Sequence, residues 1–167
     1  MEADMPVEGI KSNYKVIPVA GDAKSIQARY RKGHGKNPVV ITSLDEVDAF
    51  IDDLLDGESD YNTLAEVYSQ DREVTALGFP DHQLMVCASK SLGLGLVSYM
   101  DANGNFTSLG SPETRTKPTY HFVWNTTQFA DHSEIPIPLL RQAVKEFLIS
   151  GGRQPTCLEW QPETFGA

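Results

Sequence analysis

Apolar and polar residues alternate along several short stretches of the chain, which is the pattern of strands with one buried face. Residues 26–30 alternate in this way, and the apolar run at 38–42 predicts a second strand after a turn at 33–35. An Asn-Gly pair within 101–105 is typical of a tight hairpin turn, because these residues tolerate positive φ, and predicts a strand starting near Phe106. Four further strands are predicted at 64–68, 83–88, 95–99 and 120–124.

Two other stretches carry apolar residues at helical spacing. Ser43 is suited to an N-cap, with Glu46 three residues on, so the first helix is predicted to begin there and to end at Gly57. The second helix is predicted to start at the prolines of 136–138 and to stop at the glycines of 151–152. The apolar faces comprise Leu44, Val47, Ile51, Leu54 and Leu55 in the first helix, and Leu139, Leu140, Ala143, Val144, Phe147 and Leu148 in the second.

Strands joined by hairpins, with only two helices among them, predict an α+β fold: a mainly antiparallel β-sheet with two amphipathic helices packed on it. A short strand at 156–160 is expected to close the chain. The length of 167 residues suits one domain, which we place at 26–167, preceded by a flexible or irregular segment at 1–25.

Composition narrows the class of protein. No apolar run approaches the roughly 20 residues that span a bilayer, and the amino terminus lacks the basic and apolar parts of an export signal, so we expect a cytoplasmic protein without a membrane partner. Cys87 and Cys157 are far apart and are expected to be reduced, packed thiols. The net charge of −9 argues against direct nucleic-acid binding, which needs clustered Lys and Arg.

Enzymatic patterns are weak. The histidines at 34, 82, 121 and 132 lack metal-ligand spacing, and no G-x-S-x-G nucleophile motif occurs. Gly93-Leu94-Gly95 resembles part of a phosphate-binding loop, but a third glycine and a following helix are missing. We therefore expect no catalytic residues, no metal and no cofactor, and interpret the chain as a binding protein rather than an enzyme.

The strongest local signal is a run of acids at 45–60 that contains no Lys or Arg. Like charges at i, i+4 in a helix destabilise it by about 0.2–0.5 kcal/mol per pair, so stability alone does not favour this arrangement. The run is interpreted either as a solvated surface or as a docking patch for a basic protein. A basic block at 11–36 precedes it, and the two could face one another, which would partly neutralise the acids.

Several short motifs resemble immunity protein family one of bacterial polymorphic toxin systems. In the N-terminal half these motifs are residues 28–35, the predicted strand at 38–42 and the helix residues 46–55. Near the C-terminus they are Ile135-Pro136-Ile137-Pro138, the helix residues 143–148 and the segment Gly151-Gly152-Arg153-Gln154-Pro155-Thr156-Cys157-Leu158-Glu159-Trp160. Residues 93–99 and Gly110 suit the central hairpin of the family, so the resemblance covers about residues 26–161.

This resemblance implies an α+β inhibitor of a toxin, since members are encoded beside toxin genes and many of the toxins are nucleic-acid deaminases. The chain lacks the deaminase signature H-x-E…P-C-x-x-C and would be the inhibitor. It would bind its cognate toxin 1:1 and occlude the active site with acids in place of phosphates. The candidate partner-binding residues are Asp48, Asp52, Asp53, Asp56, Asp60 and Tyr61, with Tyr99, Asp101 and Phe106 as a second region.

Two alternatives remain open at this stage. The toxin could be a nuclease, which would be blocked by the same acidic mimicry. The chain could instead be a small-molecule-binding or enzymatic α+β domain. Trp124, Glu159 and Trp160 are compatible with either a structural or an interfacial role, although large aromatic residues in strands are mostly buried.

Overall fold

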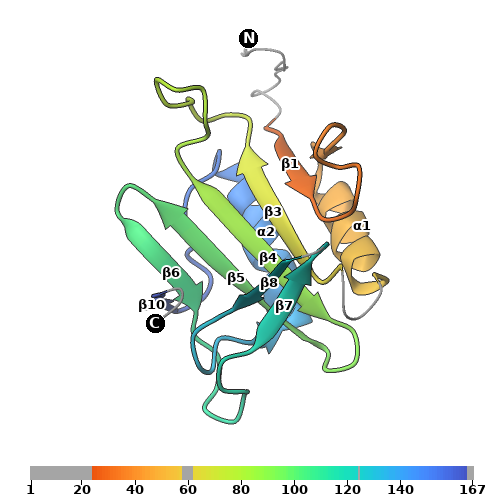
Figure 1. The fold of residues 1–167 in the computed structure, drawn as a ribbon, viewed down its shortest axis with the longest axis vertical. Coiled ribbons are helices and arrows are strands. Elements are labelled where there is room, and N and C mark those ends of the chain that lie inside the picture. The colour runs from red at the N-terminus through yellow and green to blue at the C-terminus, as the bar shows by residue number, and fades with distance from the viewer. Residues whose placement is uncertain (1–23, 58–61, 124, 165–167) are drawn as a thin grey trace.

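The computed structural model describes residues 24–57, 62–123 and 125–164, and its central feature is one large antiparallel sheet (Figure 1). Seven of its strands follow the order β10-β6-β5-β4-β3-β1-β2, and β9 pairs with β5. The strands are β1 (Ile26–Arg29), β2 (Val39–Ile41), β3 (Leu64–Ser69), β4 (Gln83–Ser89), β5 (Leu94–Asp101), β6 (Gly104–Ser108), β9 (Ile135–Pro136) and β10 (Trp160–Pro162). A separate hairpin pairs β7 (Thr119–Phe122) with β8 (Asn125–Gln128).

The elements form three layers. The two helices, α1 (Leu44–Leu55) and α2 (Ile137–Ile149), share the main core with one face of the large sheet, and the β7–β8 hairpin lies on the other face (Figure 1). The main core joins helix residues such as Phe50 and Phe147 to Val67 and Val97 of the sheet. A smaller core joins Tyr120 to residues of β3, β4 and β5. The predicted α+β class is confirmed.

The first helix begins as its sequence indicates. The Ser43 hydroxyl accepts a hydrogen bond from the Glu46 backbone N–H at 3.1 Å, while the Glu46 carboxylate accepts from the backbone N–H of Thr42 at 2.7 Å and from its hydroxyl at 2.9 Å. This arrangement satisfies amide groups that a helix start leaves unpaired. The helix ends at Leu55, with Asp56 as its C-cap, two residues before the predicted stop at Gly57.

The closing strand lies further along the chain than predicted. It spans Trp160–Pro162 and pairs with β6, whereas residues 156–159 form no strand. The reason is that this segment is bonded to α2 instead: the backbone N–H and hydroxyl of Thr156 both donate to the Glu146 carboxylate, at 2.8 and 2.7 Å. Trp160 is half-buried against the main core, Glu159 is exposed, and Trp124 lies outside the described residues.

Helix α2 approaches the sheet closely at Gly95 in β5. A Cβ atom at this position would lie 2.3 Å from the Cys87 carbonyl oxygen and 2.8 Å from Leu140 Cδ2. Glycine is therefore required first by the carbonyl oxygen of the neighbouring strand β4, and second by the approach of Leu140 from the helix. Cys87 is buried and Cys157 half-buried, both as free thiols, and burial raises the pKa of each.

None of the described helices is long and apolar enough to cross a membrane. The segment expected to be irregular, 1–25, falls almost entirely outside the described residues, so its state stays a prediction.

Candidate functional site

The acids of α1 form one candidate surface, which we call the acidic helix surface and define by the helix residues and C-cap that carry carboxylates. Its members are Asp45, Glu46, Asp48, Asp52, Asp53 and Asp56. All are exposed or half-buried, because the opposite side of the helix supplies Val47, Phe50, Ile51 and Leu54 to the core. Asp60 and Tyr61, which the sequence also singles out, lie outside the described residues.

Two cations of α2 bind this surface. Arg141 donates to Asp48 at 3.1 Å and to Asp52 at 2.5 Å, and Lys145 donates to Asp48 at 2.7 Å. The hydrogen bond from Lys145, together with those from Arg141, holds the pKa of Asp48 below its usual value. These ion pairs join α1 to α2, and the apolar side of α1 packs in the main core with the sheet.

Asp53 is bound from the other side of the helix. The buried Tyr30 hydroxyl donates to its carboxylate at 2.6 Å, and Arg31 donates to it at 3.0 Å. The hydrogen bond from Tyr30 first, and that from Arg31 next, lower the pKa of Asp53. Arg31 belongs to the basic block that precedes the acids in sequence, so the two blocks do meet here.

The last acid of the surface has the weakest partner. Asp56 and Lys90, on the turn between β4 and β5, are 3.3 Å apart, and their side chains are 68% and 74% exposed. Exposed pairs of this kind contribute about 0–1 kcal/mol. With Arg31, Lys90, Arg141 and Lys145 counted against the six acids, the surface keeps an excess of two negative charges. It is therefore acidic, but not of a single sign as the local sequence suggests.

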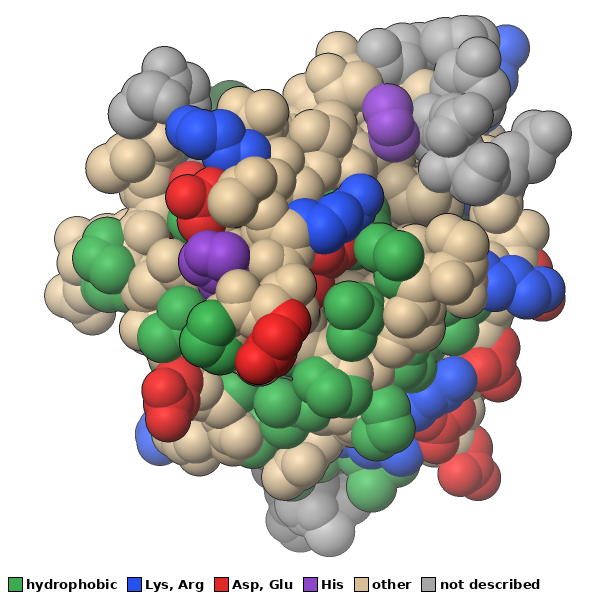
Figure 2. Space-filling model, turned by 90° about the horizontal axis from the view of Figure 1, so that it is seen from below, with side chains coloured by type: hydrophobic (Ala, Val, Ile, Leu, Met, Phe, Trp, Pro, Cys, Tyr) green, Lys and Arg blue, Asp and Glu red, His purple; other side chains and the backbone are tan. Residues whose placement is uncertain are grey.

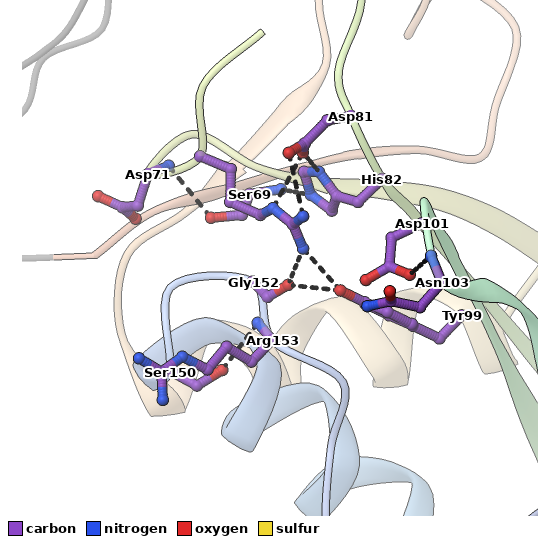
Figure 3. Close-up of polar contacts among 11 residues, drawn as sticks. Ser69, Asp71, Asp81, His82, Tyr99, Asp101, Asn103, Ser150, Gly152 and Arg153 are labelled. Carbon is purple, nitrogen blue, oxygen red and sulfur yellow. Dashed lines mark hydrogen bonds and ion pairs between the residues drawn. The ribbon is translucent and has the colours of Figure 1, made fainter. Parts of the chain in front are cut away.

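The second predicted region, around the β5–β6 hairpin, is divided between core and surface. Tyr99 is 2% exposed, and its hydroxyl accepts from Arg72 at 2.6 Å and donates to the Gly152 carbonyl at 3.2 Å. Asp101 and Phe106 are half-buried, and the Asp101 carboxylate accepts from the Asn103 backbone N–H at 2.8 Å (Figure 3). The hairpin thus leaves Asp101 and Phe106 partly exposed, while Tyr99 supports it from inside.

Arg72 is the centre of a polar cluster beside this hairpin, because it donates to Tyr99, Gly152 and Asp81. Figure 3 labels these three partners. The Arg72 guanidinium donates to the Gly152 carbonyl at 2.8 Å and to Asp81 through two nitrogens, at 2.9 and 3.1 Å. Although burial opposes the charge of Asp81, the hydrogen bonds from Arg72 and His82 hold its pKa below the usual value. The cluster joins the end of β3, the start of β4 and the turn that follows α2.

The histidine of this cluster has the neighbours of a catalytic base without its geometry. His82 Nδ1 lies 3.0 Å from Asp81 Oδ1, and Nε2 accepts the backbone N–H of Ser69 at 2.8 Å. The Ser69 hydroxyl accepts from the Asp71 backbone N–H and is not hydrogen-bonded to the imidazole. The Asp-His-Ser group therefore has the bonds of a structural contact, in which His82 holds the backbone of Ser69 and not its hydroxyl.

A surface hollow of about 640 Å³ lies at the opposite end of the sheet, between the end of α1, the β4–β5 turn and β7. Figure 2 shows this end of the molecule, where hydrophobic side chains gather and Lys and Arg side chains alternate with acids at one edge. The cations Lys90 and Arg115 line the hollow, but Lys90 is paired with Asp56 and Arg115 with the buried Glu134. Among the described residues, no group of three His, Cys, Asp or Glu side chains is placed to hold a metal ion.

Sequence reasoning missed two of these arrangements. Arg72 with Asp81, and Arg115 with Glu134, are separated by 9 and 19 positions in the chain, and no motif marks either pair. The sequence signals for these pairs were an Asp-His pair at 81–82 and a Glu directly before Ile135-Pro136, and neither specifies a partner.

A comparison with curated proteins finds no significant match. A model of the family described as "Immunity protein Imm1" matches residues 35–162, which confirms the resemblance that the sequence motifs indicate. Because the match extends from the turn before β2 to the end of β10 and covers well over half of the chain, this protein belongs to the Imm1 family of immunity proteins, which act against toxins.

Proposed function

We propose that this chain neutralises a cognate DNA or RNA cytosine deaminase toxin by binding it 1:1 and covering its active site. The inhibition is steric and electrostatic, and no bond is made or broken by the immunity protein. It acts in the cytoplasm, without a cofactor and without binding nucleic acid or membrane itself.

The acidic helix surface is the observation that carries this proposal. A deaminase must hold a polyanionic strand while the target base enters its zinc site, so the entrance to that site is expected to be basic. The helix presents Asp52 and Asp56, which are 63% and 68% exposed, on a backbone fixed by α2 and the sheet. Carboxylates held in this way can replace phosphate contacts without first being ordered, which favours tight binding.

The existing ion pairs determine which acids are available. Asp56 exchanges Lys90 for a toxin cation at little cost, because both side chains are largely in water. Asp48 and Asp53 have two donors each from within the chain, so they contribute mainly to the local potential. Asp60, Tyr61, Asp101 and Phe106 complete the proposed contact residues, and Tyr99 holds the hairpin from within.

The test uses the purified chain and the toxin domain encoded by the neighbouring gene. Calorimetry should give a stoichiometry of one, and added immunity protein should abolish deamination of single-stranded DNA or RNA oligonucleotides in proportion to its concentration. Cleavage of the oligonucleotides by the toxin, inhibited in the same way, would replace the deaminase by a nuclease. Absence of binding to the toxin would contradict the immunity function.

A second candidate function rests on the hollow beside the β4–β5 turn, whose size falls within the range of small-molecule sites. A metabolite that binds there would raise the melting temperature of the isolated chain. Such stabilisation together with no binding to the toxin domain would favour a small-molecule-binding or enzymatic role over the proposed one.

A further inference from the structure

The connection between β3 and β4 exposes three large apolar side chains at its tip. Val74 is 62% exposed, Leu77 83% and Phe79 64%, and we call these three residues the loop tip. The loop extends away from the end of the sheet (Figure 1). Single exposed apolar residues are common on proteins, but three such residues within six positions of one loop form a patch that calls for a binding role.

The loop is ordered by its own hydrogen bonds. The Thr75 backbone N–H donates to the Phe79 carbonyl at 2.7 Å, and the Gly78 backbone N–H donates to the Thr75 carbonyl at 2.8 Å. An isolated antiparallel bridge joins Val74 to Pro80. Gly78 has φ of +85°, a conformation that favours glycine. The apolar side chains are therefore presented in one arrangement, which lowers the entropy lost on binding.

The base of the loop is fixed as well. Arg72 and Asp81 face each other at its two ends, and Arg72 also donates to the Gly152 carbonyl and the Tyr99 hydroxyl (Figure 3). These bonds connect the loop to the turn after α2 and to β5. A side chain at the tip thus has a defined position relative to the whole sheet.

Acids lie at the base of the loop, on both sides of the apolar tip in sequence. The segment 71–81 contains Asp71, Glu73 and Asp81 and one cation, Arg72, which is paired with Asp81. Asp101, on the adjoining hairpin, lies close to the same cluster (Figure 3). Lys24, beside Asp71 at Gly151, and Arg153, beside Gly152, bring cations to the same base, so acids are in small excess there. An apolar tip above a base with this excess of acids is complementary to an apolar recess with a basic rim.

We propose that the loop tip inserts into an apolar recess with a basic rim on the toxin domain and is the main determinant of the dissociation rate. This inference rests on the proposed immunity function and names a second contact region, distinct from the acidic helix surface. Buried apolar anchors control dissociation, whereas exposed charges act mainly on association. A second copy of this chain fits the tip less well, because a symmetric contact would bring Glu73 and its acidic neighbours against themselves.

Surface plasmon resonance with the immobilised toxin domain tests the proposal. The double variant Leu77→Gln with Phe79→Gln should weaken Kd by about 30-fold, mostly through faster dissociation, which is the effect of losing hot-spot side chains. Leu109→Gln is the matched control, because Leu109 is 40% exposed on the far side of the sheet, after β6; its Kd should stay within about twofold of wild type. Melting temperatures should be unchanged in both.

A second variant examines the order of the loop rather than its side chains. Gly78→Ala adds a Cβ that meets nothing within 4 Å, but the positive φ strains it, so the loop loses its fixed arrangement while Leu77 and Phe79 remain. We expect about a threefold to tenfold weaker Kd, consistent with the loss of preorganisation.

The outcomes separate the two proposals. If wild type inhibits the toxin and the double variant binds with unchanged Kd, the loop-tip proposal is wrong and the immunity function stands. If wild type does not bind the toxin, both fail. The isolated wild-type chain could also dimerise in a concentration-dependent way. If the double variant does not, the tip binds a second copy of this chain and not a recess on the toxin.

Discussion

Arg115 forms a two-pronged ion pair with Glu134, whose side chain is completely buried. Arg115 Nε and Nη2 donate to the two carboxylate oxygens of Glu134 at 2.9 and 2.8 Å, and the Tyr120 hydroxyl donates to the same carboxylate. Glu134 stands directly before β9, and Tyr120 lies in β7. Glu134 thus binds the small hairpin through Tyr120 and the loop before the hairpin through Arg115, on the side of the large sheet opposite the helices.

Arg115→Ala should lower the free energy of unfolding by about 3 kcal/mol, because it leaves a buried carboxylate without its cation. Urea denaturation at pH 7 measures the loss. Adding Glu134→Gln to Arg115→Ala should restore part of the stability, since the remaining buried group is then neutral. If the double variant is less stable than Arg115→Ala alone, the cause is packing and not the unpaired charge.

Reversing the exposed acids should slow toxin association. For Asp52→Lys with Asp56→Lys we expect about a tenfold lower association rate and a weaker dependence on salt, with little change in dissociation, since complementary charge steers encounter. Stopped-flow mixing with the toxin domain at several salt concentrations provides the measurement. The control is Glu113→Lys, which reverses an exposed acid on the loop between β6 and β7. Unchanged association rates in the double variant would restrict these acids to a role in solubility.

Replacing Asp53 should lower the stability of the fold, because its carboxylate is bonded to Tyr30 and Arg31. Asp53→Ala removes a charged acceptor to which the Tyr30 hydroxyl and Arg31 both donate, so we expect a loss of about 1–3 kcal/mol of unfolding free energy. Asp45→Ala, at an exposed position in the first turn of the same helix, should change it by less than about 1 kcal/mol. Thermal or urea denaturation of the two variants would reveal whether Tyr30 depends on this carboxylate; equal stabilities would show that it does not.

Stability should fall as the pH drops below neutral, partly because of His82. Burial first, and the charge of Arg72 next, hold the pKa of His82 below its ordinary value of 6.5, against the opposing effects of Asp81 and Asp101. Below pH 6.5, His82 takes up a proton in the unfolded chain, whereas it stays neutral in the folded chain until the pH reaches its lower folded pKa. The stability that this group contributes above pH 6.5 is therefore lost as the pH falls towards the folded pKa. Urea denaturation at pH 7.5 and 5.5 measures the difference.

His82→Gln should reduce this pH dependence. His34, whose pKa is also lowered, first by burial and then by Arg31, would remain as the source of the rest. The lowered pKa values of Asp48, Asp53 and Asp81 affect stability in a more acidic range, because unfolded aspartates, with an ordinary pKa of 3.8, are already ionised above pH 5. If His82→Gln keeps the full wild-type dependence of stability on pH, other groups cause that dependence.

Local sequence patterns predicted most of the fold because they depend on neighbouring residues. Alternation indicates β3, β4 and β5 to within one or two residues, and the Ser43 cap and apolar spacing place α1. The closing strand was misplaced, since the bonds of Thr156 to Glu146 connect positions ten apart and no local pattern specifies them. The order of the strands, with β9 beside β5, likewise depends on contacts distant in sequence.

The candidate surfaces divide in the same way. The sequence by itself determined that α1 carries many acids on its outer side and that the chain resembles an immunity protein, because both are properties of residue order. Only the tertiary structure decided that Arg141 and Lys145 neutralise part of that charge, that Tyr99 is buried, and that Leu77 and Phe79 project from an ordered loop. The physical reason is that charge pairing and exposure depend on distances between residues that folding brings together, and those distances have no trace in the local pattern.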